Sequence, residues 1–158
     1  MDSLYLDIET RSFPQALHYI TVVGFYHAST GLTQMIWPDI TAESLAAALP
    51  DAKHIYTYNG NGFDLPVIRG HLGLDLLERY KSRDLMYSCR SKGLKGGLKK
   101  VEFQLGIDRD QHPLNNFQIQ ECWTRWKHKG DEEALEVLLK YNEEDVMSLV
   151  AIREKLGI

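Results

Sequence analysis

The stretch Ser3-Leu-Tyr-Leu-Asp-Ile-Glu-Thr10 decides how the rest of the chain is interpreted. Apolar residues at its even positions alternate with Tyr5, Asp7 and Glu9, which is the period-two pattern of a β-strand. Side chains two positions apart on a strand share a face, so Asp7 and Glu9 project together. Two neighbouring carboxylates on a central strand are costly unless they are paired or bind a metal ion. The alternative is an exposed edge strand with solvated acidic groups.

Two further acidic signatures follow along the chain. The stretch Asn59-Gly-Asn-Gly-Phe63-Asp64 places an aspartate after a glycine-rich turn, at the expected start of a helix, where the helix macrodipole also favours a negative charge. The stretch Tyr141-Asn-Glu-Glu-Asp145 places a tyrosine and an aspartate four positions apart, on one face of a helix. Glu143 and Glu144 point away from that face, and we expect them to be solvated.

A fold that gathers these acidic groups in one place must neutralise them. Like charges at close range do not all stay ionised unless a cation offsets them, and hard ions such as Mg²⁺ take oxygen ligands. Two such ions about 4 Å apart make a site that cleaves phosphodiester bonds. The candidate metal ligands are Asp7, Glu9, Asp64 and Asp145.

The length of 158 residues suits a single domain over residues 1–158 with its own hydrophobic core. No window approaches the roughly 18 uninterrupted apolar residues that a membrane span needs, and the N-terminal Met-Asp-Ser-Leu lacks the segments of a secretion signal. Cys89 and Cys122 have neither CxxC nor zinc-ligand spacing, so free thiols in a reducing cytosol are expected. These features predict a cytoplasmic protein that contacts no membrane.

The net charge of −4 argues mildly against a nucleic-acid partner, but the charges are unevenly distributed. Lysines and arginines crowd the segment 79–100, where Asp84 is the only acidic residue, and a second basic cluster at 125–129 lies next to Trp123 and Trp126. An acidic pocket flanked by basic segments is typical of a nuclease. The alternative is a set of solvated helix and loop faces. We expect both tryptophans to pack in the core rather than to form a stacking platform.

Strand patterns dominate the first part of the chain, and the periodicity after residue 70 is helical. Further strands are predicted at 20–27, 33–37 and 54–58, and helices at 41–49, 64–72, 98–105, 117–129 and from 131 towards 156. Thr41 caps the first helix, Gly106 ends the helix at 98–105, and the pair Tyr141-Asn142 marks a candidate break in the last helix. Strands followed by helices indicate an α/β or α+β sheet covered by the later helices.

The three signatures together resemble the DEDD superfamily of 3′–5′ exonucleases. Asp7-Ile-Glu9-Thr10 resembles the first exonuclease motif, Asn59-x-x-x-Phe63-Asp64 the second, and Tyr141-x-x-x-Asp145 the third in its tyrosine form, DEDDy. The histidine form would need His-x-x-x-x-Asp, and Lys140 stands in the place of that histidine.

Other segments extend the resemblance over nearly the whole chain. The stretches Leu98-Lys-Lys-Val-Glu102-Phe-Gln-Leu-Gly106-Ile and Arg83-Asp84-Leu85 are similar to the YprB-type predicted exonucleases, and the motifs are similar to those of family B DNA polymerase proofreading domains. The resemblance implies an α/β, ribonuclease-H-like fold in which a central mixed β-sheet of early strands is flanked by α-helices.

The resemblance also implies a mechanism with two divalent cations, Mg²⁺ or Mn²⁺. Asp7 would bridge both ions, Glu9 and Asp145 would help hold the ion that binds the attacking water, and Asp64 would hold the second ion through water. Tyr141 would orient the attacking water; a phenol that titrates near pH ~10 is a poor general base at neutrality. The implied substrate is single-stranded DNA or RNA with a free 3′ end, and the products are nucleoside 5′-monophosphates.

Several residues around the motifs are candidates for substrate contacts. Thr10 and Asn59 would touch the terminal nucleotide, against ordinary cap and turn roles. Phe63 would stack on the terminal base, which contributes ~1–3 kcal/mol, against packing in the core. Lys92 and Lys95 belong to a glycine-rich basic segment that would wrap a single strand, against a mobile surface loop.

Asp84 is a further candidate, either as a charge behind the metal ligands or as a helix cap.

Two other functions compete with the exonuclease. The first is a ribonuclease-H-like endonuclease, against which the spacing of Tyr141 and Asp145 argues. The second is a catalytically weak nucleic-acid-binding module, against which the complete set of acidic residues argues.

Overall fold

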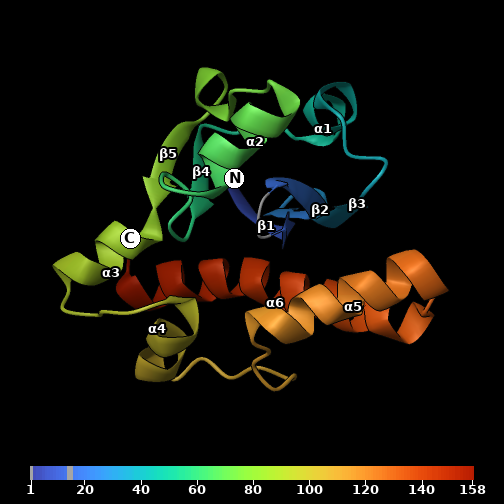
Figure 1. Cartoon of the computed structure of the whole chain (residues 1–158). Helices are drawn as coiled ribbons and strands as arrows, with labels where there is room; N and C mark the ends of the chain where they lie inside the picture. The colour runs from blue at the N-terminus through green and yellow to red at the C-terminus, as the bar shows by residue number, and fades with distance from the viewer. Residues whose placement is uncertain (1, 14–15) are drawn as a thin grey trace.

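The computed structural model describes residues 2–13 and 16–158. A mixed five-stranded sheet, ordered β3-β2-β1-β4-β5, separates two layers of helices, with α1 and α2 on one face and α4, α5 and α6 on the other (Figure 1). The strands are β1 (Ser3–Phe13), β2 (Ala16–His27), β3 (Gly31–Ile36), β4 (His54–Thr57) and β5 (Lys81–Asp84). The helices are α1 (Ala42–Ala48), α2 (Asp64–Leu72), α3 (Leu85–Ser91), α4 (Leu98–Leu105), α5 (Asn116–Lys129) and α6 (Glu132–Leu156), with a short 3₁₀ turn at Leu76–Glu78. The predicted α/β architecture with a mixed sheet is confirmed.

Strand β1 lies at the centre of the sheet, as its two adjacent carboxylates suggested. It pairs antiparallel with β2 and parallel with β4. The even-numbered residues Leu4, Leu6 and Ile8 are buried in the core beneath α1 and α2. The opposite face of the sheet carries Asp7 and packs against α6. The alternative of an exposed edge strand is therefore wrong.

Local signals set several helix boundaries where they were predicted. Thr41 caps α1 by accepting a hydrogen bond from the Ser44 amide at 3.0 Å, while the Ser44 hydroxyl accepts one from the Thr41 amide at 2.9 Å. Gly106 ends α4 in the left-handed conformation with φ 69°. Trp123 is buried, and Cys89 and Cys122 are free thiols, as expected. The boundaries at Thr41 and Gly106 depend on residues nearby in the sequence, so the sequence pattern was sufficient to predict them.

The predicted break at Tyr141-Asn142 is wrong, because α6 runs without interruption from Glu132 to Leu156. Asparagine tends to interrupt helices when its side chain competes for backbone hydrogen bonds. Here the Asn142 amide is fully buried and bonds to other elements: its Nδ2 donates to the Asp7 carbonyl at 3.1 Å and to Asp7 Oδ2 at 3.2 Å. Its Oδ1 accepts from Gln34 at 3.0 Å. Asn142 therefore joins α6 to the sheet.

The purely helical interpretation of the chain after residue 70 is also wrong, because β5 forms at Lys81–Asp84. This strand pairs parallel with β4 at the edge of the sheet. Its sequence, Lys-Ser-Arg-Asp, has no alternating apolar residues, because most of an edge strand faces solvent and its stability comes from backbone pairing.

None of the helices in the described part of the chain has the length and hydropathy to cross a bilayer.

The close approach of α6 to the sheet generates a first prediction. A Cβ atom at Gly24 of β2 would lie 2.0 Å from Asn142 Oδ1, whereas a Cβ at Gly70 of α2 would meet nothing within 4 Å. We expect Gly24→Ala to lower the free energy of unfolding by about 1–3 kcal/mol through overpacking. Gly70→Ala, as the matched control, should raise it by about 0.5–1 kcal/mol, because alanine favours the helix. Urea denaturation of both variants measures the two changes.

Candidate active site

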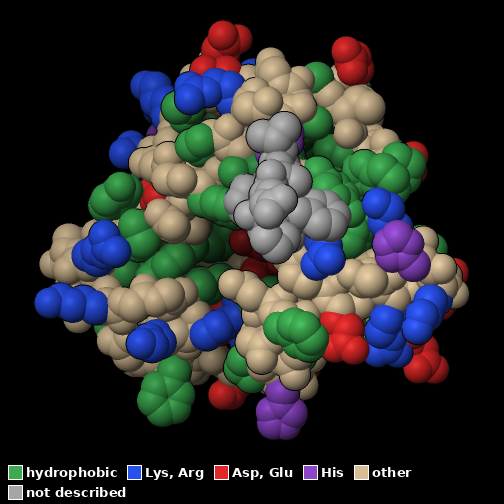
Figure 2. Space-filling view, in the orientation of Figure 1, with side chains coloured by type: hydrophobic (Ala, Val, Ile, Leu, Met, Phe, Trp, Pro, Cys, Tyr) green, Lys and Arg blue, Asp and Glu red, His purple; other side chains and the backbone are tan. Residues whose placement is uncertain are grey.

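Three acidic side chains from two elements meet on the face of the sheet that α6 covers. Asp7 and Glu9 of β1 and Asp145 of α6 each place one carboxylate oxygen within 4.8 Å of the others. Asp64, the first residue of α2, lies beside this cluster, where its Oδ2 accepts a hydrogen bond from the Ile8 amide at 3.1 Å. Figure 2 shows acidic side chains set back in a recess near the centre of the visible face.

Removal from water and mutual repulsion both act on these acidic groups. Burial raises the pKa of Asp7 well above its usual value, and the charges of Asp145, Glu9 and Asp64 raise it further. Burial, followed by the charge of Asp145, raises the pKa of Glu9 to about 8. Burial also raises the pKa of Asp64 to about 7, although its bond from the Ile8 amide opposes the shift. Shifts of this kind cluster at functional sites.

The residues present fit a divalent cation. Carboxylate oxygens are the ligands that Mg²⁺ prefers, and the cluster offers three within a few ångströms of one another. Glu9 Oε1 is buried and has no hydrogen-bond partner among residues 2–13 and 16–158. A buried carboxylate oxygen without a partner is costly, and a metal ion would satisfy it.

Two basic side chains already offset part of the negative charge. The Lys99 ammonium of α4 forms an ion pair with Asp145, and Arg109 Nη1 lies 2.8 Å from Asp145 Oδ1. The ammonium of Lys99 also lies 4.6 Å from the centre of the Tyr141 ring. Neither cation was singled out from the sequence, because both contacts join residues more than 30 positions apart.

Arg109 is the hub of a buried ionic network. Its guanidinium, with a side chain only 6% exposed, also contacts Glu102 Oε1 at 2.8 Å and Glu144 Oε2 at 3.1 Å. Glu144 accepts further hydrogen bonds from the Asp110 and Gln111 amides at 3.1 and 3.2 Å. The expectation that Glu144 is solvated is therefore wrong, because the chain after α4 folds back over this helix face and supplies the partners.

Tyr141 lies one helical turn before Asp145 on α6 and borders the acidic cluster. Burial raises the pKa of its phenol above the ordinary value, and the charges of Asp145 and Glu9 add to this shift. The phenol is therefore protonated at neutral pH and can donate a hydrogen bond, but it cannot serve as a base.

A cavity of about 300 Å³ opens beside Glu9. Its lining comes from β1, the loop before α2 and the first turns of α5, through Ile8, Glu9, Thr10, Phe63, Asn116, Ile119 and Gln120. Thr10 and Phe63 are therefore in position to touch a ligand next to the acidic cluster, although Phe63 also packs against the core. The side-chain amide of Gln120 donates a hydrogen bond from Nε2 to the Thr10 carbonyl at 2.8 Å and fixes one wall of this cavity.

Asp84 connects the loop before α2 to the start of α3. Its carboxylate accepts hydrogen bonds from the amides of Asn59 at 2.8 Å, Asn61 at 3.2 Å and Met86 at 3.0 Å. It thus caps α3 and also holds the turn that leads to Asp64, where Asn59 adopts a positive φ of 60°. Asn59 contributes its backbone to this turn.

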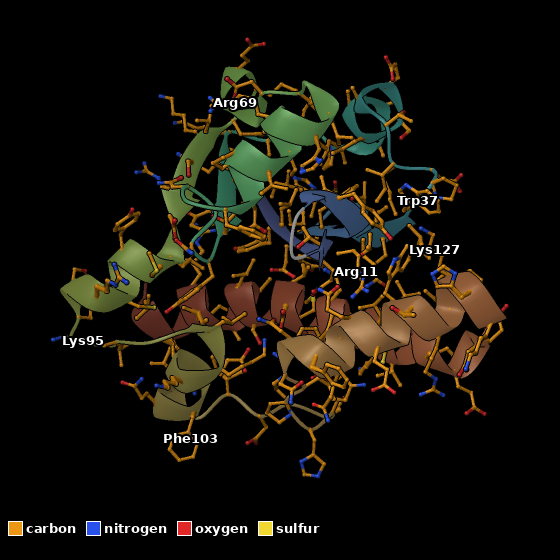
Figure 3. All side chains as sticks on the ribbon, viewed as in Figure 1. Arg11, Trp37, Arg69, Lys95, Phe103 and Lys127 are labelled. Atoms are coloured by element: carbon orange, nitrogen blue, oxygen red, sulfur yellow. The ribbon has the colours of Figure 1, made fainter. Side chains whose placement is uncertain are left out.

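The two lysines considered for substrate contacts lie away from the recess. The Lys92 ammonium donates to the Leu156 carbonyl at 2.9 Å and so binds the C-terminal end of α6. Lys95 lies at the edge of the molecule in Figure 3, on the far side of the view from Trp37 and Lys127.

The sequence model of the RNase H superfamily matches residues 4–157. The chain belongs to the RNase H superfamily. This membership agrees with the sheet order and the acidic cluster at the centre of the sheet. A comparison with the curated proteins finds no significant sequence match to this RNase H superfamily chain.

Solved structures show the same fold. The family B DNA polymerase of the hyperthermophilic archaeon Pyrobaculum calidifontis aligns with a TM-score of 0.74 at 19% identity, covering 98% of this chain and 24% of the polymerase. Brucella melitensis NrnC bound to pGG aligns with a TM-score of 0.67 at 15% identity, covering 99% of this chain and 72% of NrnC. The Aedes aegypti Nibbler EXO domain aligns with a TM-score of 0.60 at 10% identity, covering 99% of this chain and 78% of the EXO domain. The chain thus spans about a quarter of the polymerase, and its ribonuclease-H-like fold is confirmed.

The Arg109 network provides a second prediction. Arg109→Met should lower the free energy of unfolding by about 3–5 kcal/mol, because Glu102 would remain buried without its partner and Asp145 would keep only Lys99. Arg125→Met is the matched control, since Arg125 forms an exposed ion pair with Asp131 and its loss should change stability little. Thermal and urea denaturation compare the two; equal losses would contradict the buried network.

The raised carboxyl pKa values provide a third prediction, for the protein in chelator without metal ions. The folded state holds protons on Glu9 and Asp64 up to about pH 8 and 7, whereas the unfolded chain releases them near pH ~4. Since the folded state binds more protons in this interval, its stability is greatest below the unfolded pKa and falls as pH rises through the folded pKa.

The free energy of unfolding should therefore decrease between pH 5 and pH 8.5. Urea midpoints measured across this range test it, with Glu9→Gln as the comparison. The variant should lose less stability with rising pH than the parent protein, and parallel curves for the two would refute the assigned shift.

Proposed function

We propose that this chain is a metal-dependent 3′–5′ exonuclease of the DEDDy type, acting on single-stranded DNA or RNA. The observation that carries the proposal is the cluster of a buried Asp145 with the partly buried Asp7 and Glu9, with Asp64 beside it and one buried Glu9 oxygen without a partner. The fold similarity to the Nibbler EXO domain and to NrnC bound to pGG supports a nucleic-acid substrate.

In this proposal the acidic residues hold two divalent cations, Mg²⁺ or Mn²⁺. When bound, such ions lower the pKa of a coordinated water and stabilise negative charge on a leaving oxygen. Asp7, at the centre of the cluster, would contact both ions. Glu9 and Asp145 would hold the ion that carries the attacking water, and Asp64 would act on the second ion through water.

Tyr141 would position the attacking water. Its pKa is raised, so the phenol keeps its proton and donates a hydrogen bond to the water oxygen. The water oxygen forms a new bond to the phosphorus atom, and the bond from phosphorus to the 3′ oxygen of the preceding nucleotide breaks. The attacking water loses a proton to solvent, the leaving oxygen takes up a proton from solvent and becomes a new 3′ hydroxyl, and the product is a nucleoside 5′-monophosphate.

The cavity beside Glu9 would receive the terminal nucleotide. Thr10 and Phe63 line it at the point where β1 and the loop before α2 approach each other, so they can contact the sugar and the base. Asn59 would act by shaping the turn that carries Phe63 and Asp64, since its backbone amide is bound by Asp84.

A degradation assay provides the fourth prediction. DNA and RNA single strands of matched sequence, labelled at the 5′ end, should shorten stepwise from the 3′ end in Mg²⁺ or Mn²⁺ and stay intact in chelator. Asp7→Asn should reduce cleavage to background. Tyr141→Phe should slow turnover by about 100-fold, because the loss of one preorganised hydrogen-bond donor at a reacting centre typically costs that much. Tyr87→Phe, a change to an exposed tyrosine of α3, is the matched control and should retain full activity.

Three results would contradict the proposal. Cleavage of a circular single strand would favour an endonuclease, and release of the labelled nucleotide as the first product would indicate attack from the 5′ end. Binding without any cleavage in either metal ion would favour a nucleic-acid-binding module.

A further inference from the structure

An aromatic and basic surface lies beside the candidate active site, on β2, α5 and the residue that follows β3. Three rings pack together: the centre of the Trp37 ring is 5.9 Å from that of Tyr19 and 6.1 Å from that of Trp123, with the two indoles nearly perpendicular at 84°. Trp123 is buried and donates its indole N–H to the Tyr19 hydroxyl at 2.6 Å. Trp37 is 39% exposed. Its ring is thus supported from within and accessible from outside.

A lysine fixes a positive charge next to the exposed ring. The Lys127 ammonium, in the last turn of α5, lies 4.7 Å from the centre of the Trp37 ring and 5.2 Å from that of Tyr19. Cation–π contacts of this kind hold the charge over the face of an aromatic ring. His128 and Lys129 follow on the same turn. The surface therefore combines a flat aromatic face with positive charge, which are the two features that bind single-stranded nucleic acids.

This surface is continuous with the cavity beside Glu9. Arg11, two positions after Glu9 on β1, donates to Gln120 Oε1 at 2.9 Å, and Gln120 lines that cavity. Helix α5 rises roughly 10 Å between Gln120 and Lys127, the length of about three stacked nucleotides. In Figure 3, Arg11 lies near the centre of the molecule, and Lys127 and Trp37 lie close together further towards the right of the view.

We propose that Trp37, with Lys127 and Arg11, forms a secondary binding site for single-stranded nucleic acid. A base a few nucleotides before the 3′ end stacks on Trp37, and the intervening phosphates lie near the charges of Arg11 and Lys127. The inference rests on the proposed function for the location of the 3′ end. It adds a determinant of substrate length, because a dinucleotide fills the cavity without reaching Trp37.

The fifth prediction compares an oligothymidylate octanucleotide with the dinucleotide. In Trp37→Ala, the octanucleotide should be degraded with a KM at least about tenfold higher, because one base–aromatic stack is lost, while its kcat stays the same. Turnover of the dinucleotide should not change, and this also shows that the variant is folded. Phe103→Ala is the matched control, since Phe103 is 87% exposed on α4 and lies far from Trp37 in Figure 3.

Binding is measured separately in the Asp7→Asn protein, so that the inference is tested even where no cleavage occurs. The anisotropy of a fluorescein-labelled octanucleotide should rise on binding, and adding Trp37→Ala should raise its Kd about tenfold. Adding Lys127→Gln instead should weaken the salt dependence of binding. An unchanged octanucleotide Kd in Trp37→Ala overturns the inference and assigns the exposed indole to packing or to a protein partner. An equal loss for both substrate lengths overturns it as well.

Discussion

Repulsion between carboxylates in a partly dry recess is the constraint on which the rest of the structure depends. Asp7, Glu9 and Asp145 approach within 4.8 Å, and desolvation makes their charges more costly. The surrounding chain balances this cost from several directions: Lys99 reaches in from α4, and the guanidinium of Arg109 arrives from the segment that follows α4. Much of what lies beyond the sheet, including the course of residues 98–111, is thereby tied to the acidic cluster.

The position of α6 on the sheet depends on a polar contact rather than on apolar packing alone. The Asn142 amide bonds to both the carbonyl and the carboxylate of Asp7, at the place where Gly24 leaves room for it. Apolar residues on either side, such as Leu138 and Val146, would tolerate small shifts of the helix, whereas the amide fixes one register. Because Tyr141 and Asp145 sit on the same rigid helix, this contact also sets their places relative to β1.

The sequence predicted those parts of the fold and site that depend on neighbours along the chain. The shared face of Asp7 and Glu9 follows from the period of a strand, and the cap at Thr41 follows from local hydrogen bonding. The edge strand β5 was missed because its stability comes from pairing with β4, which its own residues do not encode as an apolar pattern. The burial of Glu144 was missed for a similar reason: its partner, Arg109, lies 35 positions away in the sequence and reaches it only in the folded chain.

The ion pair between Lys99 and Asp145 has a consequence for the order of assembly. A site made only of carboxylates would hold the surrounding elements apart until an ion arrived from solution, but this cluster contains an ammonium group of its own. The architecture can therefore be complete beforehand, and occupation by a divalent ion becomes an exchange in which one positive group leaves as another enters. The flexible Lys99 side chain, 28% exposed, is free to swing outward during such an exchange, whereas the enclosed Arg109 keeps its place. Under the proposed function, the affinity for the ion would then depend on its competition with the Lys99 ammonium.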